Sequence, residues 1–124
     1  MENKISYIIR GCAFKVYNIL GPGLFESVYE IALKHELEQS GCYVKNQICI
    51  PLYYKDIFFE NGFRVDLLIN DLVIVEIKSV EILNPVHFKQ VTTYLKMMNL
   101  KLGLLINFNS SNLSSDIKRI VNKI

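Results

Sequence analysis

The sequence has 124 residues, of which 51% are hydrophobic and 21% are charged, and its net charge at pH 7 is +2. These values are ordinary for globular proteins and exclude a disordered or fibrous chain. The length predicts one domain over residues 1–124. Because no segment has the pattern of a secretory signal or a bilayer span, we expect a cytoplasmic protein with no membrane partner.

The charges are unevenly distributed along the chain. Residues 1–84 contain eight basic and eleven acidic side chains, whereas residues 85–124 contain six basic and one acidic. A basic C-terminal third favours a polyanionic partner such as nucleic acid, although the same side chains could simply solvate helix surfaces. The three cysteines lack zinc-site spacing and are expected to be buried, reduced thiols: Cys12, Cys42 and Cys49.

Apolar residues at helical spacing predict two N-terminal helices, over residues 4–20 and 24–40. Glycines follow each of them, as is common at helix ends. The expected buried stripe of the first comprises Ile5, Ile9, Cys12, Val16 and Ile19 or Leu20. The expected stripe of the second comprises Phe25, Val28, Tyr29, Ala32, Leu33 and Leu37.

Three strands are predicted next, over residues 43–54, 63–69 and 73–78, because these segments are rich in β-branched and aromatic residues. Polar turns are expected near Asp56, at residues 60–62 and at the Asn70-Asp71 pair. The third strand is apolar until Glu76, as in a central buried strand.

A helix is predicted to begin at Asn84-Pro85, where the asparagine can cap and the proline fits the first turn. A strand over residues 100–108 and a closing helix over 113–124 complete the pattern. The resulting order, α-α-β-β-β-α-β-α, predicts an α/β (mixed α+β) fold in which a helix crossover makes at least one strand pair parallel.

Charged residues at the end of an apolar strand identify a candidate site. Glu76 and Lys78 are two apart and would project to one face, and Asp66 lies on the preceding strand. A cation would relieve the repulsion of two carboxylates, and a lysine can stabilise a phosphate oxygen. The alternative is a solvated strand edge with no chemical role.

The following helix carries polar groups that could support this cluster. Gln90 and Tyr94 are four apart and therefore on one helical side, with His87 one turn earlier. They could orient water or a phosphate. Alternatively, Tyr94 is an amphipathic core residue and Gln90 a surface amide.

These residues carry a family resemblance. Asp66, Glu76-Ile77-Lys78 and the Gln90 to Tyr94 segment resemble the D, (D/E)xK and QxxxY signatures of the PD-(D/E)XK nucleases. Residues 23–29, Gly-Leu-Phe-Glu-Ser-Val-Tyr, are similar to the signature of the GxxExxY family within that superfamily. Segments 103–108 and 117–119 also resemble the C-terminal segments of that family.

The resemblance implies a restriction-endonuclease-like central mixed sheet flanked by helices. It also implies a metal site formed by Asp66, Glu76 and the backbone carbonyl of Ile77, with Lys78 as the catalytic lysine. The remaining implied catalytic residues are Glu26, the acid on the second helix, and the supporting Gln90 and Tyr94. In this sequence Val65 stands where the superfamily motif has proline.

The leading hypothesis is therefore a Mg²⁺- or Mn²⁺-dependent phosphodiesterase acting on DNA, since hard oxygen ligands favour these ions over zinc. The alternative is a non-catalytic module that binds nucleic acid or protein, because the superfamily includes inactive members. RNA is a further candidate substrate, and the small size makes a homodimer or a protein partner plausible.

Two geometric predictions follow from this site. A two-residue loop at Asn70-Asp71 would set Asp66 opposite Val75, so a shared metal site requires an odd-length loop or a bulge. The second prediction is that Glu26 reaches the region of Lys78 instead of pointing into bulk water.

Overall fold

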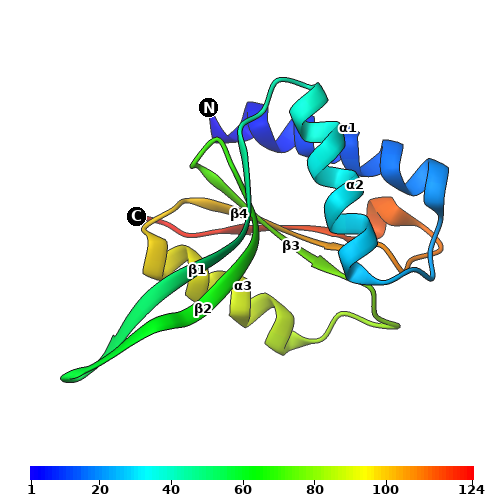
Figure 1. Ribbon diagram of the computed structural model, residues 1–124. Coiled ribbons are helices and arrows are strands. Elements are labelled where there is room, and N and C mark those ends of the chain that lie inside the picture. Colours follow the sequence, from blue (N-terminus) through cyan, green and yellow to red (C-terminus); the bar gives the residue numbers. More distant parts are fainter.

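The computed structural model describes residues 1–124 and consists of one five-stranded mixed sheet covered by helices on both faces (Figure 1). The elements in chain order are α1 (Glu2–Leu20), α2 (Glu26–Gln39), β1 (Val44–Tyr54), β2 (Ile57–Ile69), β3 (Val73–Lys78), α3 (Pro85–Met98), β4 (Leu102–Asn107), a short 3₁₀ turn η1 (Leu113–Asp116) and β5 (Ile117–Val121). The predicted fold class is confirmed. None of the helices combines the length and the apolar character that a membrane-spanning segment needs.

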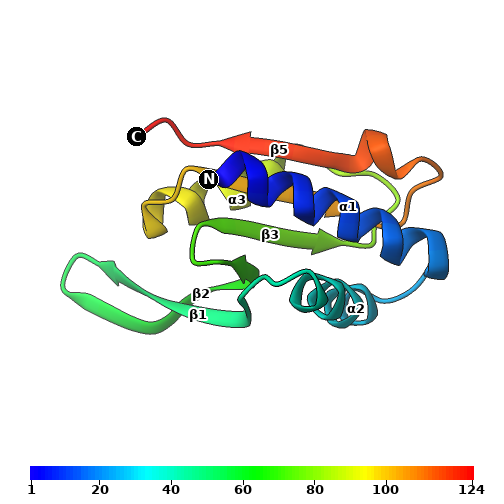
Figure 2. The ribbon, with the colours of Figure 1, turned by 90° about the horizontal axis from the view of Figure 1, so that it is seen from above.

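The strands lie in the order β1-β2-β3-β4-β5 (Figure 2). Only β3 and β4 are parallel, and α3 provides the crossover between them. The other three pairs are antiparallel. β3 and β4 are buried along almost their whole length because helices cover both faces of the central sheet.

Two apolar clusters lie on opposite faces of the sheet. The larger cluster joins α1 and α2 to the sheet, and the smaller joins α3. The buried residues predicted for α1 include Ile5, Ile9, Cys12 and Val16, and all four are buried. Ile19 and Leu20, in contrast, are exposed at the end of that helix.

The second predicted stripe is narrower than expected. Tyr29, Leu33 and Leu37 are fully buried, whereas Phe25 and Val28 are exposed because α2 begins at Glu26 and turns only one narrow face to the sheet. The cysteine prediction is also only partly correct. Cys12 and Cys42 are buried free thiols, but Cys49 is exposed on the edge strand β1.

The predicted closing helix is wrong. Residues 117–121 instead form β5, which pairs antiparallel with β4. The physical reason is the free edge of β4, whose buried backbone groups need hydrogen-bond partners. The β-branched residues Ile117, Ile120 and Val121 suit a strand, so their helical spacing misled the prediction.

The predicted turn at residues 60–62 is also wrong, because β1 and β2 form one long hairpin arm that extends beyond the rest of the sheet (Figure 1). The register shifts within this arm: Ile50 pairs with Phe63 and Leu52 with Phe59, so Glu60, Asn61 and Gly62 face the single Pro51. This is a bulge. Proline has no N–H for the ladder, which favours the irregularity at this point.

Candidate active site

The predicted loop geometry is confirmed at the β2–β3 connection. Ile69 pairs with Val73, which leaves the three-residue loop Asn70, Asp71 and Leu72. Asn70 and Asp71 adopt left-handed backbone conformations, with φ of 52° and 56°, which these two residue types tolerate better than most. The odd loop length brings Asp66 to the level of Glu76.

Two reciprocal hydrogen bonds connect β2 and β3 beyond their last ladder pair, Leu67 with Val75. The N–H of Asp66 donates to Oε1 of Glu76 at 3.0 Å, and the N–H of Ile77 donates to Oδ2 of Asp66 at 2.9 Å. Carboxylates thus replace carbonyls as the acceptors between the two strands. The two acidic side chains therefore meet where the regular ladder ends.

Glu76 is 5% exposed, which is unusual for a carboxylate. Burial, reinforced by the neighbouring Asp66 carboxylate, raises the pKa of Glu76 from 4.5 to about 8. The charge of Lys78 opposes this rise in pKa. No ion pair within 4.0 Å joins Asp66 or Glu76 to Lys78 or to Arg64. The carboxylate pair is therefore not explained by a structural salt bridge.

Lys78 ends β3 beside Asn107 of β4. Asn107 is buried and fixes the chain that follows, since Oδ1 accepts from the N–H of Val80 at 3.0 Å and Nδ2 donates to its carbonyl at 2.9 Å. The half-buried Lys78 is thus held on a rigid strand end, two residues from Glu76. Sequence reasoning did not assign this role to Asn107.

The N-terminus of α2 is tied to the same strand end. Oε2 of Glu26 accepts from the N–H of Ser79 at 3.1 Å, and the Ser79 hydroxyl donates to the carbonyl of Leu24 at 2.6 Å. The carboxylate of Glu26 consequently lies at the strand end that carries Lys78, because its partner Ser79 directly follows Lys78 in the sequence, as predicted.

Tyr29 explains why the segment before α2 has its shape. Its hydroxyl donates to the carbonyl of Gly21 at 2.6 Å and accepts from the N–H of Leu24 at 3.1 Å. Its ring stacks on Phe108 with centroids 4.6 Å apart. Gly23, with φ of 97°, supplies a backbone conformation that side chains disfavour. This loop fixes the start of α2 and with it Glu26.

Among the polar side chains predicted on α3, Tyr94 is affected by the charges of the two carboxylates. Tyr94 stacks on Phe63 with centroids 4.6 Å apart, and burial, followed by the charges of Glu76 and Asp66, raises its pKa. Gln90 is exposed and hydrogen-bonds to neither carboxylate. His87 completes the capping box of the helix with Asn84, which is a structural role.

A polar cleft of about 400 Å³ adjoins the carboxylate pair on the side of α2. It has no hydrophobic lining residue, and it is lined by Glu26, Ser27, Glu30, Gln47, Arg64 and Asp66. Burial raises the pKa of Glu30, and the nearby Asp66 adds to that shift. Sequence reasoning had not singled out Glu30 or Gln47, because neither belongs to a motif and β1 had no expected role.

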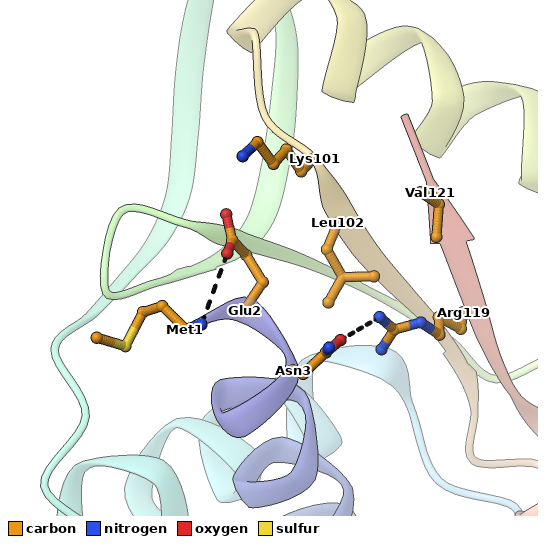
Figure 3. Close-up of a pocket in the computed structure, with 7 residues that line it drawn as sticks. All are labelled: Met1, Glu2, Asn3, Lys101, Leu102, Arg119 and Val121. Atoms are coloured by element: carbon orange, nitrogen blue, oxygen red, sulfur yellow. Dashed lines mark hydrogen bonds and ion pairs between the residues drawn. The ribbon is translucent and has the colours of Figure 1, made fainter. Parts of the chain in front are cut away.

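A second hollow, of about 190 Å³, lies between the start of α1 and strands β4 and β5 (Figure 3). Of its two cationic side chains, Lys101 and Arg119, the second donates a hydrogen bond to Asn3. It borders Leu102, at the opposite end of β4 from Asn107, the partner of Lys78. This hollow is therefore separate from the carboxylate site.

Comparison with known families identifies the chain. A family model described as the PD-(D/E)XK nuclease superfamily matches residues 3–120, and the chain belongs to that superfamily. No curated protein and no solved structure gave a significant match. Superfamily membership supports a nuclease-type activity, a nucleic-acid substrate and divalent-metal use in general terms.

Proposed function

We propose that the protein is a Mg²⁺- or Mn²⁺-dependent nuclease that hydrolyses phosphodiester bonds in DNA. The observation that carries the proposal is the meeting of Asp66 with the buried Glu76, two residues from Lys78 on one strand. Such a group of opposite charges at the end of a central strand has no ion-pair explanation within the fold.

The donor chemistry fits a hard divalent cation. Burial and mutual repulsion already hold the pKa of Glu76 near 8, which means that a positive charge at this point would be strongly favoured. No group of three or more His, Cys, Asp or Glu side chains is arranged around one point. Two carboxylates suffice for Mg²⁺, which usually keeps several waters and shares substrate phosphates as ligands.

In the proposed site, Asp66, Glu76 and the carbonyl of Ile77 would hold the ion. When bound, the ion would supply positive charge to the scissile phosphate and make a water more acidic. The ammonium of Lys78 would stabilise charge that develops on a phosphate oxygen. Glu26 and Tyr94 would orient water or phosphate from α2 and α3, and Gln90 would contact the substrate from the exposed side of α3.

We further infer that the chain represents the GxxExxY branch of the superfamily. Tyr29 and Gly23 build the loop before α2, and Glu26 contacts the strand end that carries Lys78. The proposal takes residues 1–124 as one domain that works in the cytoplasm, where free thiols such as those of Cys12 and Cys42 persist.

The competing function is a non-catalytic module that binds nucleic acid or protein, alone or as a homodimer. The small size of the domain favours it, because residues 1–124 leave little room for a separate DNA-recognition element. The decisive experiment incubates the protein with labelled single-stranded, duplex and branched DNA and with RNA, in Mg²⁺, in Mn²⁺ and in EDTA. We expect metal-dependent cleavage of at least one DNA substrate.

Asp66→Asn should abolish that cleavage, and Glu36→Gln, which changes a charge on α2 away from the site, should not. DNA binding without cleavage in any metal would favour the non-catalytic module. Cleavage confined to RNA would change the substrate but keep the site. Activity that persists in Asp66→Asn would expose a contaminating nuclease.

A further inference from the structure

Gln47 of β1 lies beside the carboxylate pair and bridges two acidic side chains. Its Nε2 donates to Oδ1 of Asp66 at 3.3 Å and also to Oε1 of Glu30 on α2. One amide nitrogen carries two hydrogens, so both bonds can form together. The side chain, which lines the polar cleft, therefore connects α2, β1 and β2.

The contacts of Asp66 come from both neighbouring strands. Oδ2 accepts from the N–H of Ile77 on β3, and Oδ1 accepts from Gln47 on β1. A carboxylate with a separate donor on each oxygen cannot rotate freely about its terminal bond. Gln47 and Ile77 together therefore hold the carboxylate of Asp66 in one orientation.

The backbone of Gln47 supports this interpretation. Its φ of 51° is in the left-handed region, which costs energy for a glutamine inside a strand. The pairing register omits Gln47 and Asp66, although the pairs on either side, Asn46 with Leu67 and Ile48 with Val65, are formed. Both strands are therefore irregular at the same level.

This irregularity changes the face to which each strand points. Val44 belongs to the cluster under α1 and α2, but Ile48 packs against the cluster under α3. On β2, Leu67 belongs to the first cluster and Val65 to the second. Residues an even number apart would share a face in regular strands. Each strand therefore changes the face that its side chains occupy at Gln47 and Asp66, where the backbone pairing is interrupted. The side chains of these two residues point toward each other and form a hydrogen bond.

We propose that Gln47 is a positioning residue that holds the carboxylate of Asp66 in its orientation toward Glu76. A neutral amide suits this task because it donates a hydrogen bond without cancelling the negative charge that a cation needs. Outer contacts of this kind orient metal-binding carboxylates in many proteins. The proposal rests on the proposed function only where it treats Asp66 as a metal ligand, since the orientation itself can be tested without metal.

The test uses two variants of Gln47. Gln47→Gly removes the amide but accepts a positive φ, so the backbone should fold as before. Gln47→Glu keeps the size of the side chain but replaces the donor with a third carboxylate. Gln39→Glu, at the exposed end of α2, makes the same change of charge away from the cleft and serves as the control.

The metal-free measurement is hydrogen exchange of the Ile77 amide, which reports whether Asp66 stays in place. We expect exchange at Ile77 to become about tenfold faster in Gln47→Gly and Gln47→Glu, and to remain unchanged in Gln39→Glu. Exchange at Leu104, inside the β3–β4 ladder, should be unaffected in all variants. Unchanged exchange at Ile77 in Gln47→Gly would overturn the proposal.

A second measurement is Mn²⁺ affinity, followed by the electron paramagnetic resonance signal of the free ion. We expect Gln47→Gly to bind Mn²⁺ about tenfold more weakly than the wild type, with no fall in melting temperature. A lower melting temperature with unchanged affinity and unchanged Ile77 exchange would assign Gln47 to the β1–β2 ladder alone. If the wild type binds no Mn²⁺ or cleaves no DNA, the proposed function fails, and Ile77 exchange still decides the role of Gln47.

Discussion

The N–H of Asp66 donates to Oε1 of Glu76 at 3.0 Å, so that a buried carboxylate of β3 accepts a backbone hydrogen bond from β2 at the point where the ladder between them ends. The N–H of Ile77 on β3 donates in turn to Oδ2 of Asp66, so each strand supplies one donor and one carboxylate acceptor to the same site. This arrangement has consequences for stability that do not depend on any substrate.

In EDTA, the stability of the protein should fall as pH rises. The pKa of Glu76 is about 8 in the folded protein against 4.5 for an ordinary glutamate, so the folded state retains a proton that the unfolded state releases. The stabilisation is complete below about pH 4.5 and is lost as pH rises through about 8, on the order of a few kcal/mol. Urea unfolding between about pH 5 and pH 9 measures it.

Glu76→Gln should remove most of that pH dependence, because the amide keeps an oxygen for the N–H of Asp66 without carrying a charge. Glu36→Gln serves as a control on α2, away from the carboxylate pair. A wild-type unfolding free energy that does not change over this range would mean that the cleft already solvates Glu76.

Mn²⁺ should raise the melting temperature of the wild type, because a ligand that binds the folded state selectively stabilises it. Asp66→Asn should abolish this rise. Above about pH 8, where Glu76 is ionised, it should also raise the melting temperature in EDTA, since one of the two repelling charges is gone. Differential scanning calorimetry with and without Mn²⁺ gives both numbers. Two results together would indicate that Asp66 has a structural role: Mn²⁺ does not stabilise the wild type, and Asp66→Asn is less stable than the wild type in EDTA.

Tyr94 has a packing role and a proposed chemical role, and two substitutions separate them. Tyr94→Phe keeps the stacked contact with Phe63 and should change the free energy of unfolding by less than about 0.5 kcal/mol. It should nevertheless slow cleavage, because the hydroxyl is lost. Tyr94→Ala should cost about 3 kcal/mol of stability. Cleavage by Tyr94→Phe at the wild-type rate would assign Tyr94 to packing alone.

Gly103 allows α3 to lie close to β4. A Cβ at Gly103 would meet Cγ1 of Val91 at 2.7 Å, so Gly103→Ala should destabilise the protein by about 1–3 kcal/mol through overpacking. Gly11 is the matched control: a Cβ there meets nothing within 4 Å inside α1, and Gly11→Ala should stabilise the protein by about 0.5–1 kcal/mol. Equal effects of the two substitutions in urea unfolding would contradict this packing.

The elements predicted correctly from the sequence are those in which the local residue pattern favours the same structure as the packing and strand pairing of the folded protein. The amphipathic stripe of α1, the Asn84-Pro85 helix start and the apolar run before Glu76 are of this kind. Residues 117–121 were predicted wrongly because the unpaired edge of β4 decides their conformation, and no local pattern reports that edge.

Some residues of the candidate site could likewise be predicted from the sequence, and others could not. Asp66, Glu76 and Lys78 were visible because charges interrupt apolar strands. Gln47 was not visible, because its importance comes from a left-handed backbone and from a contact with Asp66 across 19 positions in the chain. Residues of this sort are found only when the strand register is known.

The measurement that tests the central claim most directly is single-turnover cleavage of labelled DNA in Mg²⁺ by the wild type and by Lys78→Ala. Lys15→Ala, an exposed lysine on α1, controls for the loss of a positive charge. We predict metal-dependent cleavage by the wild type and Lys15→Ala, and a rate at least about a hundredfold lower in a folded Lys78→Ala protein. Cleavage by Lys78→Ala at the wild-type rate would contradict the assignment of this strand end as the active site.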